Sequence, residues 1–472
     1  MSSENKGTEG LRQLEYIKKL KNIVNEKKKE LSRDLKYMVT TFGCQMNERD
    51  SEKLSGILRD AGFIRSESEE DADIIVYNTC TVRDNADQRV FGRLGVLKRL
   101  KDKNPSLLIC LCGCMMQEDL IVEKVRKSYP HVDLIFGTHN NFKFAELLVN
   151  VYESGDKIID IWKETDEIVE DLPSERKFKF KSGINIMFGC NNFCSYCIVP
   201  YVRGRERSRK SEDILSEIER LTYDGVKEVM LLGQNVNSYG RGLEEDITFS
   251  ELLRRVCRID GLERVRFMTS HPKDLSDELI EVMKNEEKIC KHIHLPLQSG
   301  SDKVLSDMNR HYSKEKYLGI VKKLREAMPD IAITTDIIVG YPGETHEDVN
   351  ETLDVIEVAQ YEGAFTFEYS KRTGTPAASR EDQVPEDVVK TEFDRVLKAV
   401  QNMAAKKAGR FTGRTLKVLV EGVNDRDPSM VTGRTEQNYV VHFKGDRSLV
   451  GSITEVELTE CMGFYFLGRQ IG

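Results

Sequence analysis

A strand-like segment followed by an amphipathic helix recurs six times in the middle of the chain, and this pattern constrains the fold most. Such βα units in series build a parallel barrel or part of one, with the chemistry in the loops after the strands. We therefore predict an α/β protein whose central domain, residues 181–405, is a partial (β/α)6 barrel. The six strand-like segments are Gly183–Phe188, Glu228–Gly233, Arg264–Ser270, His292–Leu297, Ile331–Gly340 and Gly363–Ser370.

The loop after the first of these strands holds three cysteines, Cys190, Cys194 and Cys197, spaced as C-x3-C-x2-C. Three thiolates can hold three irons of a [4Fe-4S] cluster and leave the fourth iron open for a small ligand. The alternative is a zinc site, but structural zinc takes four ligands. No fourth cysteine or histidine lies near in the sequence. The spacing therefore favours a cluster with one open iron.

Residues 35–155 form a separate domain by their own strand–helix alternation, which predicts a parallel α/β sheet. Cys44, Cys80 and Cys114 each lie just beyond a predicted strand. Open α/β sheets bind ligands at the carboxyl ends of their strands, so these cysteines could converge on one edge. By composition alone, unrelated buried thiols are an equal alternative. Cys110 and Cys112 alternate with Cys114 along one strand, and we expect both in the core.

Two charged stretches flank this domain. In residues 1–34, helical spacing relates Leu11, Leu14, Ile17, Leu20 and Val24 among lysines and glutamates, which predicts a charged helix that packs loosely or frays. Residues 156–180 contain Pro173 and many charges, which is typical of a linker.

The C-terminal residues 406–472 contain short apolar runs between turn residues, which predicts a small antiparallel β-barrel. Small barrels of this kind often bind RNA. A basic run leads into the barrel, and such a run is as often a solvated face as an RNA contact. Its members are Lys406, Lys407, Arg410, Arg414 and Lys417.

Composition sets the remaining bounds. A net charge of −8 excludes a uniformly basic nucleic-acid coat but leaves room for local basic patches. No uncharged apolar run is long enough to span a membrane, and the N-terminus has no apolar signal core. Eleven cysteines without a signal predict a reducing compartment, the cytoplasm, with metal ligation rather than disulfides.

Polar residues at the later strand ends describe one rim of the predicted barrel, among them Gln234, Asn235, Ser270 and Gln298. We interpret His292 and His294 as structural, because a satisfied core histidine is commoner than a ligand. Four residues after the cysteine loop recur at period two and either line an RNA path or form a solvated basic strand: Tyr201, Arg203, Arg205 and Arg207.

From about residue 36 to the end, the chain resembles the radical SAM methylthiotransferase family. The resemblance rests on Gly-Cys-Gln-Met-Asn, Asn-Thr-Cys and Gly-Cys-x-x-Gln around the first three cysteines, on the C-x3-C-x2-C loop, and on Gly433–Asn438, which resembles a TRAM domain. Within the family, Leu231–Gly240 is similar to the branch that acts on N(6)-dimethylallyladenosine in tRNA.

The resemblance implies two [4Fe-4S] clusters. Cys190, Cys194 and Cys197 would hold the cluster that binds S-adenosylmethionine (SAM), and Cys44, Cys80 and Cys114 an auxiliary cluster that presents sulfur. SAM would be both radical source and methyl donor. The resemblance places SAM contacts at Tyr196, Gln234, Asn235, Ser270, Gln298 and Arg310, and RNA contacts in the basic run from Lys406 to Lys417. It identifies no catalytic residue.

The implied activity is methylthiolation of C2 of N(6)-dimethylallyladenosine at tRNA position 37, beside the anticodon. The implied partners are tRNA carrying the isopentenylated adenosine, an electron donor such as a flavodoxin or ferredoxin, and a sulfur donor; we expect a monomer with no membrane contact. Two alternatives remain. The first is a methylthiotransferase for another tRNA base or a ribosomal protein side chain, and the second is a non-catalytic RNA- or protein-binding regulator.

Overall fold

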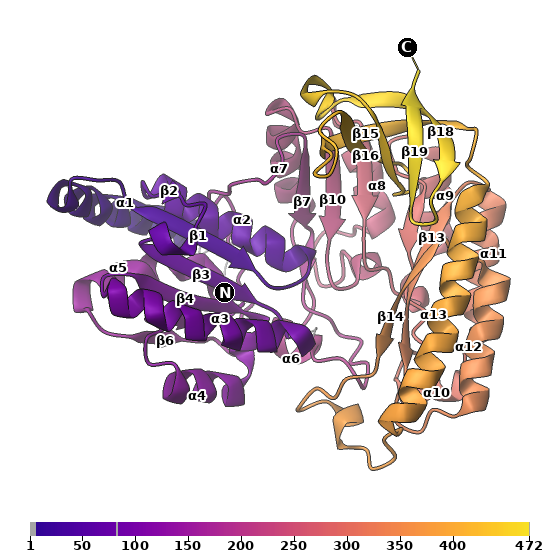
Figure 1. Cartoon of the computed structure of the whole chain (residues 1–472), viewed down its shortest axis with the longest axis horizontal. Helices are drawn as coiled ribbons and strands as arrows, with labels where there is room; N and C mark the ends of the chain where they lie inside the picture. The colour runs from indigo at the N-terminus through magenta and orange to yellow at the C-terminus, as the bar shows by residue number, and fades with distance from the viewer. Residues whose placement is uncertain (1–5, 82–83, 472) are drawn as a thin grey trace. The chain divides into compact units, whose positions relative to one another are not determined.

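A computed structural model describes residues 6–81 and 84–471 of the chain, which form two compact units (Figure 1). The first unit comprises the chain up to Phe178 together with Phe188–Asn191 and Ile198–Arg209. The second comprises Lys179–Met187, Asn192–Cys197 and the rest of the chain from Lys210. The C-x3-C-x2-C loop is therefore shared between the two units.

The first unit is built on a parallel sheet of six strands in the order β2-β1-β3-β4-β5-β6. Buried apolar residues on both faces explain why its central strands read as continuous apolar runs. Two further short strands, β8 (Met187–Phe188) and β9 (Arg207–Ser208), flank the cysteine loop in sequence. The strands of the sheet are β1 (Lys36–Thr41), β2 (Ile64–Arg65), β3 (Ile74–Thr79), β4 (Leu108–Gly113), β5 (Leu134–Phe136) and β6 (Ile158–Asp160).

Helices cover both faces of this sheet. One face packs against α1, α2 and α5, and the other against α3 and α4. Cys110 and Cys112 are buried in the first of these layers, as predicted. The helices are α1 (Lys6–Leu31), α2 (Gln45–Asp60), α3 (Asp84–Lys103), α4 (Asp119–Ser128), α5 (Phe144–Ser154) and the short α6 (Val199–Arg203).

The prediction of a loosely packed N-terminal helix is wrong. Ile17, Leu20 and Val24 of α1 are buried in the core of the first unit. Arg12 and Gln13 also bind Glu146 of α5, at 2.6 and 3.0 Å. The helix remains in place because its narrow apolar stripe packs against an apolar face of the domain. In the sequence, the many charged residues around this stripe made the helix look solvent-exposed.

Two strands of this sheet escaped the sequence analysis. β2 is two exposed residues long, and β6 lies in the stretch predicted as a linker, with only partial burial. Short edge strands carry little periodicity, so pairing with a neighbour rather than local sequence decides their structure.

The second unit contains the six parallel strands predicted for the central domain, in two sheets ordered β11-β10-β7 and β12-β13-β14. A parallel bridge from Val265 to Ile289 joins the end of the first sheet to the segment before β12. The partial barrel is therefore confirmed. Its strands are β7 (Lys181–Asn185), β10 (Glu228–Leu232), β11 (Arg264–Phe267), β12 (His292–His294), β13 (Ala332–Val339) and β14 (Gly363–Glu368).

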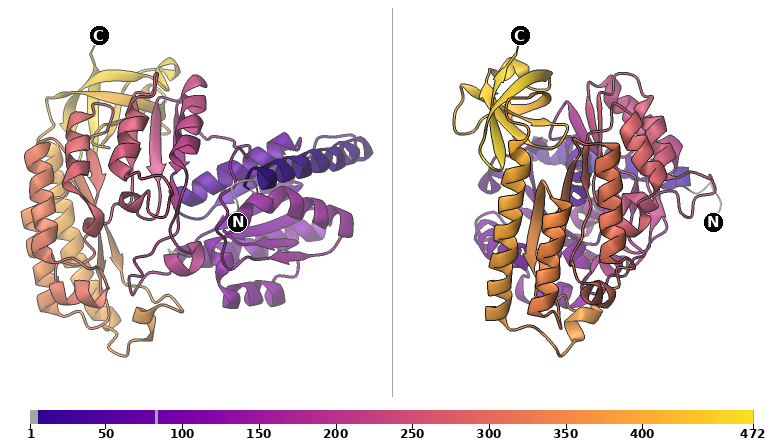
Figure 2. Two further views of the ribbon diagram at one scale, coloured as in Figure 1. Left: turned by 180° about the vertical axis from the view of Figure 1, so that it is seen from behind. Right: turned by 90° about the vertical axis from the view of Figure 1, so that its right-hand side faces the viewer.

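A layer of helices packs against the outer face of these strands and forms the largest core of the molecule. Figure 2 shows these helices side by side, with α13 running to the C-terminal barrel. They are α7 (Ser211–Tyr223), α8 (Phe249–Cys257), α9 (Asp277–Asn285), α10 (Asp302–Asp307), α11 (Lys314–Ala327), α12 (His346–Ala359) and α13 (Glu386–Gly409).

The chain ends in a closed five-stranded barrel ordered β15-β16-β17-β19-β18. Four of its pairings are antiparallel, as predicted, and β17 pairs with β19 in parallel. The sequence analysis did not identify β16, because Gly433 interrupts its apolar pattern. The strands are β15 (Thr415–Val423), β16 (Met430–Thr435), β17 (Val440–Lys444), β18 (Ile453–Cys461) and β19 (Tyr465–Gln470).

Two buried arginines of β11 attach this barrel to the central domain. Arg264 donates to the carbonyl oxygens of Arg434 and Lys417 at 3.0 and 2.8 Å, and Arg266 donates to that of Thr435 at 2.6 Å. Both arginines lie near Glu228, Arg266 at 3.0 Å and Arg264 at 3.9 Å. The barrel therefore supplies backbone acceptors for two buried arginines of the central domain. Within the described residues, no helix is long and apolar enough to cross a membrane.

Candidate functional site

The structure brings Cys44, Cys80 and Cys114 to one edge of the first unit, at the carboxyl ends of β1, β3 and β4. Gly113 has a φ of +96°, and a side chain on it would meet the Thr79 carbonyl oxygen at 2.3 Å. Only glycine allows this approach, which places Cys114 beside the end of β3. Burial, with a smaller contribution from Cys80 and Cys44, raises the pKa of Cys114 to about 12 although the nearby Arg203 lowers it.

Arg203 is buried beside this edge and binds Cys114. Its Nε donates to Cys114 Sγ at 3.1 Å, its Nη1 to Asp50 Oδ2 at 2.9 Å and its Nη2 to Asn47 Oδ1 at 3.1 Å. Burial lowers the pKa of Arg203, but Cys114 and Asp50 raise it by more, so the guanidinium stays charged. The cysteine edge therefore contains a fixed positive charge that is already balanced by a carboxylate.

Asn47 connects the parts of this edge. It accepts from Cys44 Sγ at 3.3 Å and donates to Asn78 Oδ1 and the Thr79 carbonyl oxygen at 3.1 and 2.9 Å. Sequence reasoning missed Asn47 and Asp50 as site residues. The available signal was their spacing: they lie three residues apart near the start of α2, directly after Cys44, and so share one helix face.

The placement of Arg203 corrects the prediction of a basic strand with period two. Tyr201 and Arg203 lie in α6, where Arg203 is buried and Tyr201 is exposed. Arg207 donates to the Thr165 carbonyl oxygen at 2.6 Å. Local alternation resembled a strand, but the segment folds as a helical turn followed by the two-residue β9. An RNA contact by Tyr201 or Arg205 remains a prediction.

The C-x3-C-x2-C loop is held by backbone geometry. Gly189 has a φ of +77°, and a side chain there would meet the Arg205 carbonyl oxygen at 2.0 Å. The Cys190 N–H donates to the Gly204 carbonyl oxygen at 3.1 Å. Further along the loop, the Cys197 N–H donates to the Cys194 carbonyl oxygen at 2.9 Å, so these two cysteines share one turn.

Arg310 is the buried cation beside Cys194. Its Nη1 lies 3.6 Å from Cys194 Sγ, while neutral oxygens hold its other nitrogens: Tyr312 Oη at 3.0 Å and the Pro296 carbonyl oxygen at 2.9 Å. Among the described residues, no carboxylate pairs with Arg310. Burial lowers its pKa, but Tyr312, Tyr196 and Cys194 raise it by more, so the side chain stays charged.

Buried polar atoms without partners mark the rim of the barrel. Ser270 Oγ, Gln298 Oε1 and Asn237 Oδ1 accept or donate no hydrogen bond within the described part of the chain. Gln298 also has a φ of +72°, and Thr269 a φ of +70°, both in the left-handed region. Strained backbone and unpaired polar groups concentrate where ligands bind.

The other predicted SAM contacts have protein neighbours. Asn235 donates to Asp274 Oδ2 at 2.7 Å and accepts from the His271 N–H at 3.3 Å, so its amide is engaged in holding the loop. Tyr196 packs partly buried against a small cluster that includes Tyr341. Gln234 follows β10 at the rim. Contacts of all three with SAM remain predictions.

The inner face of β12, β13 and β14 carries the histidines. His292 Nε2 and His294 Nδ1 each lie 3.1 Å from Thr334 Oγ1, and His294 Nε2 lies 3.3 Å from Asp336 Oδ2. Burial lowers the pKa of His292 well below its usual range. Both imidazoles thus have protein partners, as structural histidines do.

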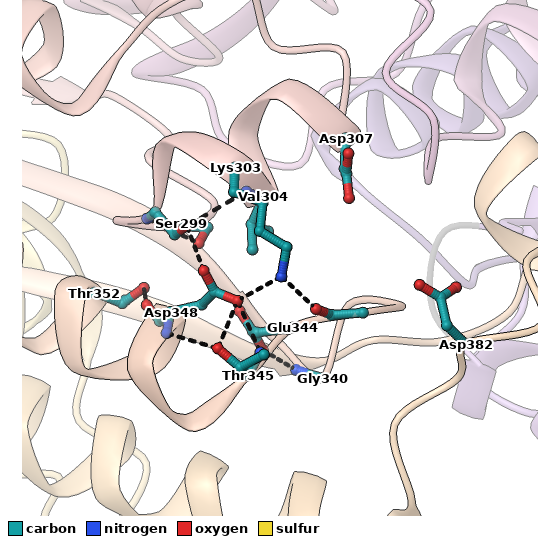
Figure 3. A network of polar contacts seen from close by, with 12 residues as sticks. Ser299, Lys303, Val304, Asp307, Gly340, Glu344, Thr345, Asp348, Thr352 and Asp382 are labelled. Carbon is teal, nitrogen blue, oxygen red and sulfur yellow. Dashed lines mark hydrogen bonds and ion pairs between the residues drawn. The ribbon is translucent and has the colours of Figure 1, made fainter.

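The turn that connects β13 to α12 is held by a polar network (Figure 3). Thr345 caps α12 in a capping box with Asp348. Lys303 reaches Asp348 Oδ2 at 3.0 Å and the Gly343 carbonyl oxygen at 2.8 Å. Burial alone would raise the pKa of Asp348, but these donors and Ser301 hold it at about 2. The network fixes the loop, and both carboxylate oxygens of Asp348 accept from protein donors.

The residues of the basic run before the C-terminal barrel have different surroundings in the structure. Arg410 pairs with Glu362 at 2.9 Å and Arg414 with Asp330 at 2.6 Å. Lys407 donates to Gln360 at 3.2 Å. Lys406 and Lys417 are exposed, and neither forms an ion pair within the described residues. The two arginines therefore pair with acids of the central domain, and an RNA contact by Lys406 and Lys417 remains a prediction.

Comparison with known proteins now adds to this geometry. Residues 184–356 match the radical SAM superfamily, residues 36–137 the uncharacterized protein family UPF0004, and residues 409–471 the TRAM domain. The tRNA-2-methylthio-N(6)-dimethylallyladenosine synthase of Lachnoclostridium phytofermentans is 59% identical over 442 residues, which cover 94% of this chain and 97% of the relative. The chain belongs to the tRNA-2-methylthio-N(6)-dimethylallyladenosine synthase family. The resemblance identified in the sequence is thereby confirmed.

A second synthase of this family, from Clostridium tetani, is 51% identical over 452 residues, which cover 96% of this chain and 100% of the relative. The solved radical S-adenosylmethionine methyltransferase TsrM from Kitasatospora setae has a TM-score of 0.53 at 14% identity, over 73% of this chain and 77% of that chain. At that identity the match shows a shared fold. Membership of the radical SAM superfamily implies SAM and a [4Fe-4S] cluster.

The side chains of this synthase family member fit those groups. In the described part of the chain, no three His, Cys, Asp or Glu side chains are gathered as around a single metal ion, so the fit is judged on the neighbours of the cysteines. Each triad has a buried arginine that donates to one sulfur, Arg203 to Cys114 and Arg310 to Cys194. Such donors suit thiolates that ligate a cluster. The unpaired Ser270 Oγ and Gln298 Oε1 suit a polar ligand such as SAM.

Proposed function

We propose that this protein attaches a methylthio group to C2 of N(6)-dimethylallyladenosine in tRNA, at position 37 beside the anticodon. The observation that carries the proposal is identity of 59% over 94% of the chain to a synthase of that name. Both cysteine triads, which a binding-only protein would not need, support it. They argue against the alternative of a non-catalytic regulator.

The proposed cofactors are two [4Fe-4S] clusters and SAM. Cys190, Cys194 and Cys197 would hold one cluster, and Cys44, Cys80 and Cys114 the other. When bound, these groups supply an organic radical that can open an aromatic C–H bond, an open iron for sulfur, and a methyl group. The protein's task is to position the reactants and exclude water.

Arg310 has the clearest role towards SAM. Its charge is buried and held only by neutral oxygens and Cys194 Sγ. A buried charge without an opposite partner is costly, so an anionic group of a ligand would stabilise it. The carboxylate of SAM is such a group. Ser270 and Gln298 would complete the site with the hydrogen bonds that they lack.

Two exposed aromatic side chains suggest where the target base binds. Phe365 and Phe367 of β14 are 58% and 42% exposed. Asp336 of β13 pairs in register with Phe365, and Ile338 with Phe367, so both rings share the inner face with Asp336. The Phe365 ring also lies edge-on to His294, with centroids 5.9 Å apart.

Aromatic rings that line a site in which a base is unstacked from a single-stranded loop commonly stack on that base. We propose that Phe365 and Phe367 stack on the adenine and contact its dimethylallyl group. The apolar rings would then favour the prenylated adenosine over plain adenosine, because burial of the five-carbon group adds apolar contact.

The C-terminal barrel would bind tRNA, with Lys406 and Lys417 as its phosphate contacts. An electron donor such as a flavodoxin or ferredoxin would reduce the SAM cluster, and a sulfur donor would supply the auxiliary cluster. We further propose that the protein acts as a monomer in the cytoplasm, where its tRNA substrate is found.

The test is nucleoside mass spectrometry of tRNA from a strain that lacks the gene. The methylthio derivative should disappear and N(6)-dimethylallyladenosine should accumulate in its place. In a purified reaction, tRNA with the dimethylallyl group should be methylthiolated and matched tRNA without it should not. Equal conversion of both tRNAs, or a methylthiolated ribosomal protein instead, would contradict the proposed substrate.

A further inference from the structure

A cavity of about 60 Å³ lies within the first unit, and Arg203, which donates to Cys114, lines it. Asp50, His139, Arg203 and Arg207 line its polar end, and Leu54 and Phe142 belong to its apolar wall. The Arg203 guanidinium is 3.1 Å from Cys114 Sγ, so one side chain both lines this cavity and contacts the auxiliary cysteine edge. No role proposed above uses this cavity.

His139 is the most informative side chain in the lining. It is 4% exposed, and its Nε2 makes no hydrogen bond to any described residue. Gly204 lies against the ring: a side chain there would meet Cε1 at 3.0 Å. Burial, together with the charges of Arg207 and Arg203, lowers the pKa of His139 to about 4. The imidazole is therefore neutral near pH 7 and can donate one N–H.

Arg207 contributes a second unsatisfied nitrogen. Its Nη1 donates to the Thr165 carbonyl oxygen at 2.6 Å, but its buried Nε has no partner among the described residues. The guanidinium carbon lies 5.9 Å from the centre of the Phe188 ring, which holds the side chain in place. A buried polar group left unpaired destabilises the fold, so two of them in one lining favour a ligand that binds both.

The volume of the cavity and the charges of its lining limit which ligands it can bind. A water needs about 10–15 Å³ of such space, so 60 Å³ admits only a few heavy atoms and excludes SAM or a nucleoside. Two guanidinium groups line the cavity. Arg203 is paired with Asp50 at 2.9 Å, whereas the Arg207 Nε has no hydrogen-bond partner among the described residues. A cation with an unpaired N–H thus lies beside a second N–H donor and an apolar wall. This combination fits a small, weakly hydrated anion.

We propose that this cavity binds a small sulfur anion such as hydrosulfide, with His139 and Arg207 as its hydrogen-bond donors and Arg203 as the wall shared with Cys114. The assignment rests on the proposed function, because methylthiolation consumes sulfur next to these cysteines. Chloride has the same charge and similar size, so binding and sulfur use need separate tests.

Binding is tested with bromide, whose anomalous scattering locates it. Crystals of the reconstituted holoenzyme soaked in bromide should show a peak within hydrogen-bond distance of His139 Nε2 and Arg207 Nε. The peak should be absent from His139→Phe, which fills the space and removes the donor. It should persist in His131→Phe, a histidine of the same unit that lies outside the cavity and bonds to the Leu94 carbonyl oxygen. Water alone at the site in wild type would overturn the proposal.

Sulfur use is tested by the hydrosulfide dependence of methylthiolation. His139→Phe should raise the KM for hydrosulfide about tenfold, the loss of one charge-assisted hydrogen bond. Formation of 5′-deoxyadenosine and iron content should stay at wild-type values, as should every property of His131→Phe. Arg207→Gln, which retains side-chain volume, provides the same test if His139→Phe does not fold.

The outcomes are distinguishable. A bromide peak with an unchanged KM in both variants would refute the sulfur assignment. If the proposed function is wrong, wild type makes no methylthiolated product at any hydrosulfide concentration, whatever the bromide result.

Discussion

The two cysteine sites are built on the same pair of components, a triad of thiols and one buried arginine, but the arginines are held differently. Arg203 is paired with Asp50 at 2.9 Å, within its own unit. Arg310 is held by the Tyr312 hydroxyl and a backbone carbonyl oxygen, both neutral. Among the described residues, the first charge has a carboxylate partner and the second has none. We therefore predict a permanent group at the Cys114 site and an exchangeable anionic ligand beside Cys194.

Removal of each triad gives the largest expected effects. Replacing Cys190, Cys194 and Cys197 by Ala should abolish conversion of SAM to 5′-deoxyadenosine. It should also leave about half of the roughly eight irons that two [4Fe-4S] clusters provide. Replacing Cys44, Cys80 and Cys114 should leave 5′-deoxyadenosine formation intact and abolish methylthiolation. Both products are measured in one reaction under a strong chemical reductant.

If the second triple variant makes methylthiolated product at wild-type yield, the two triads do not both hold clusters. The auxiliary triad would then be only a set of core thiols. Iron that stays at the wild-type value in the first variant would equally contradict the assignment of the SAM cluster.

Arg203→Met should cost about 3–5 kcal/mol of unfolding free energy, because it leaves Asp50 buried without its partner. The double variant Arg203→Met/Asp50→Asn should recover most of that loss, since no net charge remains buried. Urea denaturation measures both. In the recovered double variant, the auxiliary cluster should have a more negative reduction potential, because one N–H donor to a sulfur is gone. An unchanged potential would make Arg203 purely structural.

Arg310 has no carboxylate partner in the described part of the protein that its loss would leave unpaired. Arg310→Met should therefore act mainly on the affinity for the ligand. We expect the KM for SAM to rise about 10–100-fold, the loss of a hydrogen bond to a charged group. The free energy of unfolding should fall little or rise, because an unbalanced buried charge is removed. A stability loss as large as that of Arg203→Met would show that the two arginines play the same role.

Substitution of Phe365 and Phe367 tests whether these rings bind the prenylated adenine of the tRNA. Stacking on a base is worth about 1–3 kcal/mol per ring by alanine substitution. Phe365→Ala/Phe367→Ala should therefore weaken the binding of prenylated tRNA more than that of plain tRNA. The preference is measured as the ratio of the two dissociation constants. Phe464→Ala, an exposed ring of the C-terminal barrel, is the matched control. An unchanged ratio would exclude this face as the prenyl site.

The sequence predicted those features that depend on neighbours in the chain. The C-x3-C-x2-C loop, the six barrel strands and the cysteines at strand ends follow from spacing and periodicity. The features it could not predict depend on distant partners. Arg203 meets Cys114 and Asp50 only after α6 packs on the first unit, and α1 meets α5 more than a hundred residues away. The same reason explains Arg410 and Arg414, whose acidic partners lie in the central domain.

The smallest expected effects come from substitutions in the basic run. They distinguish the lysines, which we expect to bind tRNA, from Arg414, which we expect to stabilise the fold. Lys406→Glu and Lys417→Glu should each weaken tRNA binding severalfold and reduce the salt slope of binding by about 1, because each removes one phosphate contact. The unfolding free energy should hardly change, since both side chains are exposed. Arg414→Gln should behave oppositely and cost up to about 1 kcal/mol of stability through the loss of the surface pair with Asp330. If instead Arg414→Gln lowers the salt slope and the lysine variants do not, the arginines rather than the lysines bind the phosphates.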